Sequence, residues 1–200
     1  LGFQVLSDEY KVMGLAPYGQ PRYLQQLRAL VRSGDGGLYA LDPRYFDFSH
    51  SQRMFTAALP ELLGMPQRAR ESEISQAHKD LARSLQVVLE EILIEKVHHL
   101  HRIAPSDNLC LAGGVALNCV ANHQLHLRGP FKNLFVQPAA GDSGSALGAA
   151  IGFNPVQTGI KFHPPGRLPL VVAGQAQVEI GRYAAGVKGY ITLAFFKGVQ

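Results

Sequence analysis

Cysteine, charge and long apolar runs are all scarce in this sequence, and each scarcity excludes a class of protein. Two cysteines, Cys110 and Cys119, are too few for a disulfide framework and too far apart for a CxxC motif. We therefore expect both to be core residues of a protein from the reducing cytoplasm. No apolar run reaches the roughly 18 residues of a membrane span, and the first residues show no signal peptide. These absences predict a soluble protein.

The charged residues are few and dispersed. They make up 17% of 200 residues, too few for a disordered chain, while 46% hydrophobic residues suffice for a core. The formal net charge of +4 comes from scattered lysines and arginines, which argues against a nucleic-acid partner but leaves an attraction for anionic ligands. The sequence begins at Leu1, close to a dense motif, so we expect it to be a segment of a longer polypeptide.

Apolar spacing predicts an alternation of helices and strands. The strongest pattern is a helix over 72–103, with Ser72 as its N-cap and Pro105 after its end. The other expected elements are a loop over 14–21, a short amphipathic helix over 22–32, a hairpin or extended segment over 37–49, strands over 108–113 and 133–138, and helices over 115–127 and 142–153. This order predicts a layered α/β fold.

Two glycines, Gly113 and Gly114, separate the strand at 108–113 from the helix that follows it. Glycines there remove the side chains that keep a ligand from the backbone, next to the first N–H groups of a helix. The pair would thus admit a phosphate, a ribose or an adenine edge. For a glycine pair taken alone, a tight turn or close packing is the commoner explanation, because glycine is frequent at turns and helix ends, and both interpretations stay open.

A second turn of the same type follows the next strand, in VQPAAGDSGSALGAA at 136–150. Asp142 stands at the head of a helix of small residues, where it is either a simple N-cap or a functional carboxylate. If the two strands are adjacent, both glycine turns face one cleft at the same edge of the sheet.

Two other polar clusters resemble a metal site and an acid/base pair, but their spacing supports neither. His98 and His101 lie three residues apart near the end of the long helix, where the helix dipole favours them, and we expect a solvated face there, not a metal site. Glu90 and Glu91 are adjacent on that helix, so their carboxylates point apart and cannot form one acid/base pair.

Three motifs in this order carry a family resemblance: SDEYKVMGLAPYG, LAGGVALNCVAN and QPAAGDSGSALGAA. Together they resemble the O-carbamoyltransferases, a family that includes enzymes decorating nodulation factors and antibiotics. The resemblance covers residues 1–152 and implies part of an actin-like domain, of the ribonuclease H-like superfamily of sugar kinases and heat-shock chaperones. Residues 153–200 depart from the family pattern and are expected to be a divergent or aberrant tail.

The resemblance also implies an activity. In such proteins a second domain makes carbamoyladenylate from carbamoyl phosphate and ATP, and the actin-like domain delivers the carbamoyl group to a hydroxyl of a small-molecule or glycan acceptor. Asp142 resembles the aspartate of a divalent-metal site, with iron as the expected ion, Mg²⁺ accompanying ATP, and two histidines upstream of this sequence. Gly113, Gly114 and Asn118 resemble the nucleotide-binding wall, and Lys11 is a candidate phosphate contact.

Three alternatives stay open at this level. Without the upstream histidines, the chain alone is expected to be inactive, so a non-catalytic nucleotide-binding fragment is one alternative. A threonylcarbamoyl transferase-like protein of related fold is another. An actin-like kinase is the third, but it needs a carboxylate base and different phosphate turns.

Overall fold

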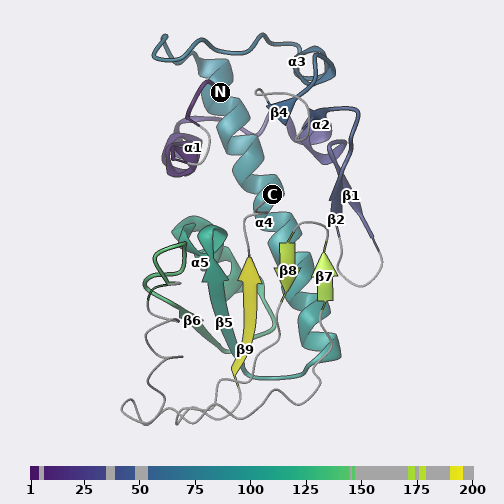
Figure 1. The fold of residues 1–200 in the computed structure, drawn as a ribbon, viewed down its shortest axis with the longest axis vertical. Helices are drawn as coiled ribbons and strands as arrows, with labels where there is room; N and C mark the ends of the chain where they lie inside the picture. Colours follow the sequence, from purple (N-terminus) through teal and green to yellow (C-terminus); the bar gives the residue numbers. More distant parts are fainter. Residues whose placement is uncertain are drawn as a thin grey trace. The chain divides into compact units, whose positions relative to one another are not determined.

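The computed structural model describes residues 1–4, 7–34, 39–47, 54–144 and 146, and the strands at 171–173, 176–178 and 190–195 (Figure 1). The chain divides into two compact units, an N-terminal unit that ends at Leu93 and a C-terminal unit that continues from Ile94. Both combine helices with small sheets, which confirms the expected mixed α/β class.

Helix α4, Gln76–Ile103, is the long helix expected from the sequence, but it begins four residues later than predicted. Ser72 is not its cap, because the Ser72 hydroxyl donates to the carbonyl of Ala69 (2.8 Å). The helix instead starts after Ser75, whose N–H donates to Nδ1 of His78 (3.0 Å). Its end before Pro105 is as predicted.

The core of the N-terminal unit gathers around four buried side chains, Leu27, Leu30, Leu81 and Val88. The helix expected over 22–32 is shorter, α2 at Leu24–Arg28, because the chain becomes extended in β1, Val31–Ser33. Strand β1 pairs antiparallel with β2, Tyr39–Leu41, and β3, Phe46–Asp47, pairs antiparallel with β4, Met54–Phe55. The segment 37–49 is therefore shared between two hairpins.

The expected loop over 14–21 is partly helical. Helix α1 covers Glu9–Leu15 and a 3-10 helix, η1, covers Ala16–Tyr18, where a proline suits the first helical positions. The chain then meets α4 closely: a Cβ on Gly19 would lie 2.0 Å from the carbonyl oxygen of Lys79. The N–H of Gln20 donates to Oδ1 of Asp80 (2.8 Å), which fixes this turn against the helix.

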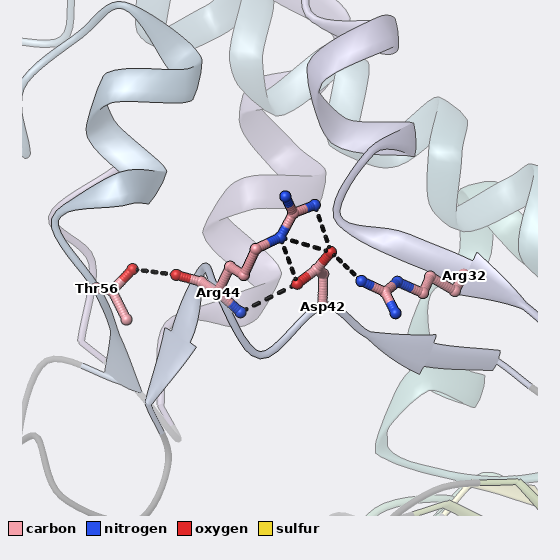
Figure 2. Close-up of polar contacts among 4 residues, drawn as sticks. All are labelled: Arg32, Asp42, Arg44 and Thr56. Carbon is pink, nitrogen blue, oxygen red and sulfur yellow. Dashed lines mark hydrogen bonds and ion pairs between the residues drawn. The ribbon is translucent and has the colours of Figure 1, made fainter.

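A buried carboxylate links the two hairpins (Figure 2). The side chain of Asp42 is 1% exposed, and its Oδ2 accepts from Nη2 of Arg32 (2.7 Å) and from Nη2 of Arg44 (2.8 Å). The Thr56 hydroxyl, just after β4, donates to the carbonyl of Arg44 (2.6 Å). Hydrogen bonds from Arg44 and Arg32 hold the pKa of Asp42 far below its usual range, so the carboxylate stays ionised as a common anchor.

The C-terminal unit contains a parallel sheet in the order β6-β5-β9 (Figure 1). Its strands are β5 at Asn108–Gly113, β6 at Asn133–Val136 and β9 at Tyr190–Phe195; β7, Val171–Ala173, pairs separately with β8, Ala176–Val178. Between β5 and β6 the chain forms a 3-10 helix, η3 at Gly114–Leu117, and helix α5, Cys119–Arg128. The strand–helix–strand order expected there is confirmed.

The exposure of Cys119 corrects one sequence prediction. Cys119 begins α5 and is exposed, while Cys110 on β5 is half-buried, so Cys119 is not a core residue. The core positions of β5 are Leu109 and Leu111, at 2% and 1% exposure. The helix expected over 142–153 lies largely outside the described residues. Across the described part of the chain, each helix is too short or too polar to cross a bilayer.

Candidate functional site

The turn after β5 requires glycine. Gly113 has φ 94° and ψ 165°, a backbone conformation that residues other than glycine adopt only with strain. Its N–H donates to the carbonyl of Ala140 (2.7 Å) in the turn after β6. Gly113 thus has a structural role in joining the two turns, in line with the tight-turn interpretation of the glycine pair.

The two glycine turns lie together, as the sequence predicted. Besides the Gly113–Ala140 hydrogen bond, a Cβ on Gly141 would lie 3.5 Å from Cδ1 of Leu117 in η3. The reason is the parallel pairing of β5 with β6, which brings the carboxyl ends of both strands to one edge of the sheet. We call residues 113–118 and 139–142 the glycine-turn edge.

Gly114 faces open space at this edge. A Cβ built on it meets no atom of the described residues within 4 Å, so packing against those residues does not explain the glycine. The neighbouring side chains of Val115 and Leu117 are 36% and 55% exposed, whereas Ala116 is buried. The surface around Gly114 is therefore open backbone flanked by apolar groups, a combination that suits a ligand with a flat, partly apolar face.

Asn118 caps helix α5. Its Oδ1 accepts from the N–H of Ala121 (3.0 Å), a standard N-cap bond. This bond gives Asn118 a structural role at the start of α5. Asn118 also stands four residues before Asn122, whose Nδ2 donates to the carbonyl of Ala116 (2.7 Å). The sequence interpretation missed Asn122, although its spacing from Asn118 places both on one helix face.

Asp142 follows the second glycine turn and is exposed, so its carboxylate is accessible to an ion. Among the residues that the structure describes, no group of three His, Cys, Asp or Glu side chains is close enough to bind a metal. Asp142 fits a divalent metal as one hard oxygen ligand and no more.

The histidines of α4 have structural partners. Nε2 of His98 lies 3.2 Å from the carbonyl of Arg128, and the ring of His101 meets the edge of Phe131 with centroids 5.2 Å apart. Within the described ranges neither histidine belongs to a metal-binding group.

The adjacent glutamates point apart, as predicted. Glu90 is buried and accepts from Nε2 of Gln86 (2.9 Å). Glu91 instead accepts from Nη2 and Nε of Arg28, at 2.6 and 3.0 Å. The two carboxylates therefore have separate partners.

Lys11 belongs to the N-terminal unit, whereas the glycine-turn edge belongs to the C-terminal unit. Its Nζ lies 3.0 Å from Oδ2 of Asp8, one helical turn away. The hydrogen bond with Asp8 raises the pKa of Lys11, so the ammonium stays charged. A phosphate would have to share or displace Asp8, and the phosphate contact stays a prediction.

Comparisons with known proteins agree on one family. The family model described as "Carbamoyltransferase N-terminus" matches residues 1–151. An uncharacterized protein from Synechocystis sp. is 45% identical over 151 residues, which are 75% of this chain and 25% of that protein. Nodulation protein NolO from Bradyrhizobium diazoefficiens is 41% identical over 151 residues, 73% of this chain and 25% of NolO.

Nodulation protein NolNO from Sinorhizobium fredii is similar to the same degree, with 41% identity over 152 residues, 73% of this chain and 20% of that protein. The chain thus spans a quarter or less of the length of these curated relatives. The family model covers the three motifs and the whole glycine-turn edge. This chain therefore belongs to the carbamoyltransferase N-terminus family.

Proposed function

We propose that the protein containing this chain transfers a carbamoyl group from carbamoyladenylate, made from carbamoyl phosphate and ATP, to a hydroxyl group of a small-molecule or glycan acceptor. The observation that carries the proposal is the family match over residues 1–151, which includes the open backbone at Gly114. Two relatives named nodulation proteins support it. In this proposal the chain is part of an actin-like domain of a cytoplasmic enzyme, where Cys110 and Cys119 stay reduced.

The glycine-turn edge holds the adenylate in this proposal. Gly114 lets the nucleotide approach the backbone, Asn118 accepts from the ribose, and the exposed Val115 and Leu117 give the adenine an apolar contact. In the N-terminal unit, Lys11 is proposed separately as a point-charge contact for a phosphate. Asp142 contributes one ligand to a divalent metal, iron in our proposal, which when bound polarises the carbamoyl carbonyl.

The reaction balances without a redox step. The acceptor hydroxyl oxygen forms a bond to the carbamoyl carbon, the bond from that carbon to the adenylate phosphate oxygen breaks, and AMP leaves while the hydroxyl proton passes to solvent or a base. Positioning the two reactants supplies much of the rate enhancement in such transfers.

A second candidate is a nucleotide-binding module without transfer. It is favoured by one observation: the described residues include an open glycine turn but no group of three His, Cys, Asp or Glu side chains close enough to hold a metal. The two candidates differ in whether turnover accompanies binding.

The deciding experiment uses the full-length protein with carbamoyl phosphate, ATP, Mg²⁺, ferrous iron and a panel of sugar and small-molecule alcohols, with mass spectrometry to detect carbamates and AMP. In parallel, alkylation of the exposed thiol of Cys119 is timed with and without ATP, in a Cys110→Ser background. Carbamate formation with ATP protection of Cys119 supports transfer at this edge. Protection without any carbamate favours the binding module. If ATP does not protect Cys119 and no carbamate forms, both candidates are contradicted.

A further inference from the structure

The side chains of the two asparagines of GGVALNCVAN each form a hydrogen bond with the backbone at the junction between η3 and α5. Oδ1 of Asn118 accepts from the N–H of Ala121 (3.0 Å), and Nδ2 of Asn122 donates to the carbonyl of Ala116 (2.7 Å). The backbone N–H of Asn122 also donates to the carbonyl of Asn118 (3.0 Å). We call Asn118 and Asn122 the asparagine clasp: one member caps the start of α5 and the other caps the end of η3.

The clasp is needed because the backbone breaks between the two helices. Asn118 has φ −76° and ψ 90°, an extended conformation that ends the helical hydrogen-bond pattern of η3. Ala116 is 2% exposed, so bulk water is a poor substitute partner for its carbonyl. The Asn122 amide satisfies this carbonyl, and a buried acceptor left without a donor is costly.

The held segment is the one that carries Gly114. Because η3 spans Gly114–Leu117, a bond to the Ala116 carbonyl fixes the open backbone and its exposed flanking side chains relative to α5. When only a fraction of molecules has the competent arrangement, the apparent dissociation constant rises in inverse proportion to that fraction.

We infer that Asn122 is a positioning residue for the nucleotide at the glycine-turn edge. It acts through Ala116, holding η3 in the arrangement that binds the ligand, and it does not itself contact the ligand. This inference rests on the proposed function, because it assumes that the edge binds a nucleotide.

The test is Asn122→Asp in the full-length protein. This change keeps the shape of the side chain and replaces the donor with a carboxylate oxygen facing the Ala116 carbonyl. We expect the Kd for ATP, measured by calorimetry well below the unfolding temperature, to rise about tenfold, which is about 1.4 kcal/mol. Alkylation of Cys119, the first residue of α5, should become faster at a temperature well below the unfolding midpoint of the variant, although the lost hydrogen bond lowers that midpoint.

Asn133→Asp is the matched control. Nδ2 of Asn133 donates to Oδ1 of Asn108 (2.7 Å), a bond of similar length at the opposite end of β5 and β6. The control should leave both the ATP affinity and the Cys119 rate as in the wild type. If Asn122→Asp does not fold, Asn122→Ser, which retains a shorter donor, is measured in its place.

The outcomes separate the two claims. Weaker ATP binding and faster alkylation in the Asn122 variant, but not in the Asn133 variant, support the positioning role. Equal ATP affinity in wild type and variant overturns the positioning role and leaves the proposed function intact. A wild-type protein that fails to bind ATP overturns both.

Discussion

Replacing Gly114 by alanine should separate stability from ligand binding. Gly114 lacks a positive φ, and a Cβ there meets no atom of the described residues within 4 Å, so alanine fits that part of the chain without strain. Alanine also reduces the freedom of the unfolded chain, which stabilises proteins by about 0.4–1 kcal/mol. The unfolding midpoint of the full-length protein should therefore rise, by less than the roughly 2–4 °C per kcal/mol of a domain of about 150–250 residues, because the protein measured is longer.

The same methyl group should weaken nucleotide binding, because it occupies the space through which the ligand reaches the backbone. Overfilling a close contact costs about 1–3 kcal/mol, which corresponds to about a 5- to 150-fold rise in the Kd for ATP. Gly114→Val should have a larger effect. Thermal unfolding and titration calorimetry on the full-length protein measure the two quantities.

Gly14→Ala in helix α1 is the control, because a Cβ on Gly14 also meets no atom within 4 Å. It should raise the unfolding midpoint without changing the Kd. The reasoning is refuted if Gly114→Ala binds ATP as tightly as the wild type, since the open space at Gly114 would then not be where the nucleotide lies.

Three further predictions concern other sites. Asp42 has its pKa lowered chiefly by Arg44, so its stabilising effect is complete above the unfolded-state pKa of about 3.9 and is lost as the pH falls through the folded-state pKa. Asp42→Asn should therefore lower the urea midpoint at pH 7, and the difference between the wild-type and variant midpoints should become smaller below pH 4. A difference that does not change with pH would count against the ion network. Gly19→Ala should lower the free energy of unfolding by about 1–3 kcal/mol because its Cβ would lie 2.0 Å from the Lys79 carbonyl oxygen, and an unchanged urea midpoint would exclude that contact. Asp142→Ala should leave folding intact, since the side chain is exposed, while lowering bound iron and carbamoyl transfer; equal metal content by elemental analysis would remove its role as a ligand.

The features that depend on local sequence pattern were predictable. Alternation of strand and helix patterns around Gly113 gave β5, α5 and β6, and their parallel pairing made the meeting of the two glycine turns an expected result. The predicted N-cap at Ser72 was wrong because the Ser72 hydroxyl donates to the carbonyl of Ala69. Ser75 precedes α4 instead, and its N–H donates to His78. The usual capping box has glutamate or glutamine at the position of His78, so this pattern did not identify Ser75.

Features that depend on distant segments were not predictable. The spacing of Arg32, Asp42 and Arg44 does not predict that two hairpins share one buried carboxylate. The pairing of the strands in these hairpins depends on the turns between them and not on sequence periodicity. Cys119 was expected in the core because cysteine is usually buried, yet it begins a helix at the exposed glycine-turn edge. The roles of Lys11 and Asp142 stay predictions.

The shared carboxylate of Asp42 also constrains how this part of the chain can evolve. Loss of Arg32 alone leaves Asp42 neutralised by Arg44, which supplies its other four hydrogen bonds. Loss of Asp42 first removes the carboxylate that both guanidinium groups share in the described part of the chain. Loss of Arg32 before Asp42 is therefore better tolerated than loss of Asp42 before an arginine. The effect of substituting Arg32, Asp42 or Arg44 depends on the order in which the substitutions occur.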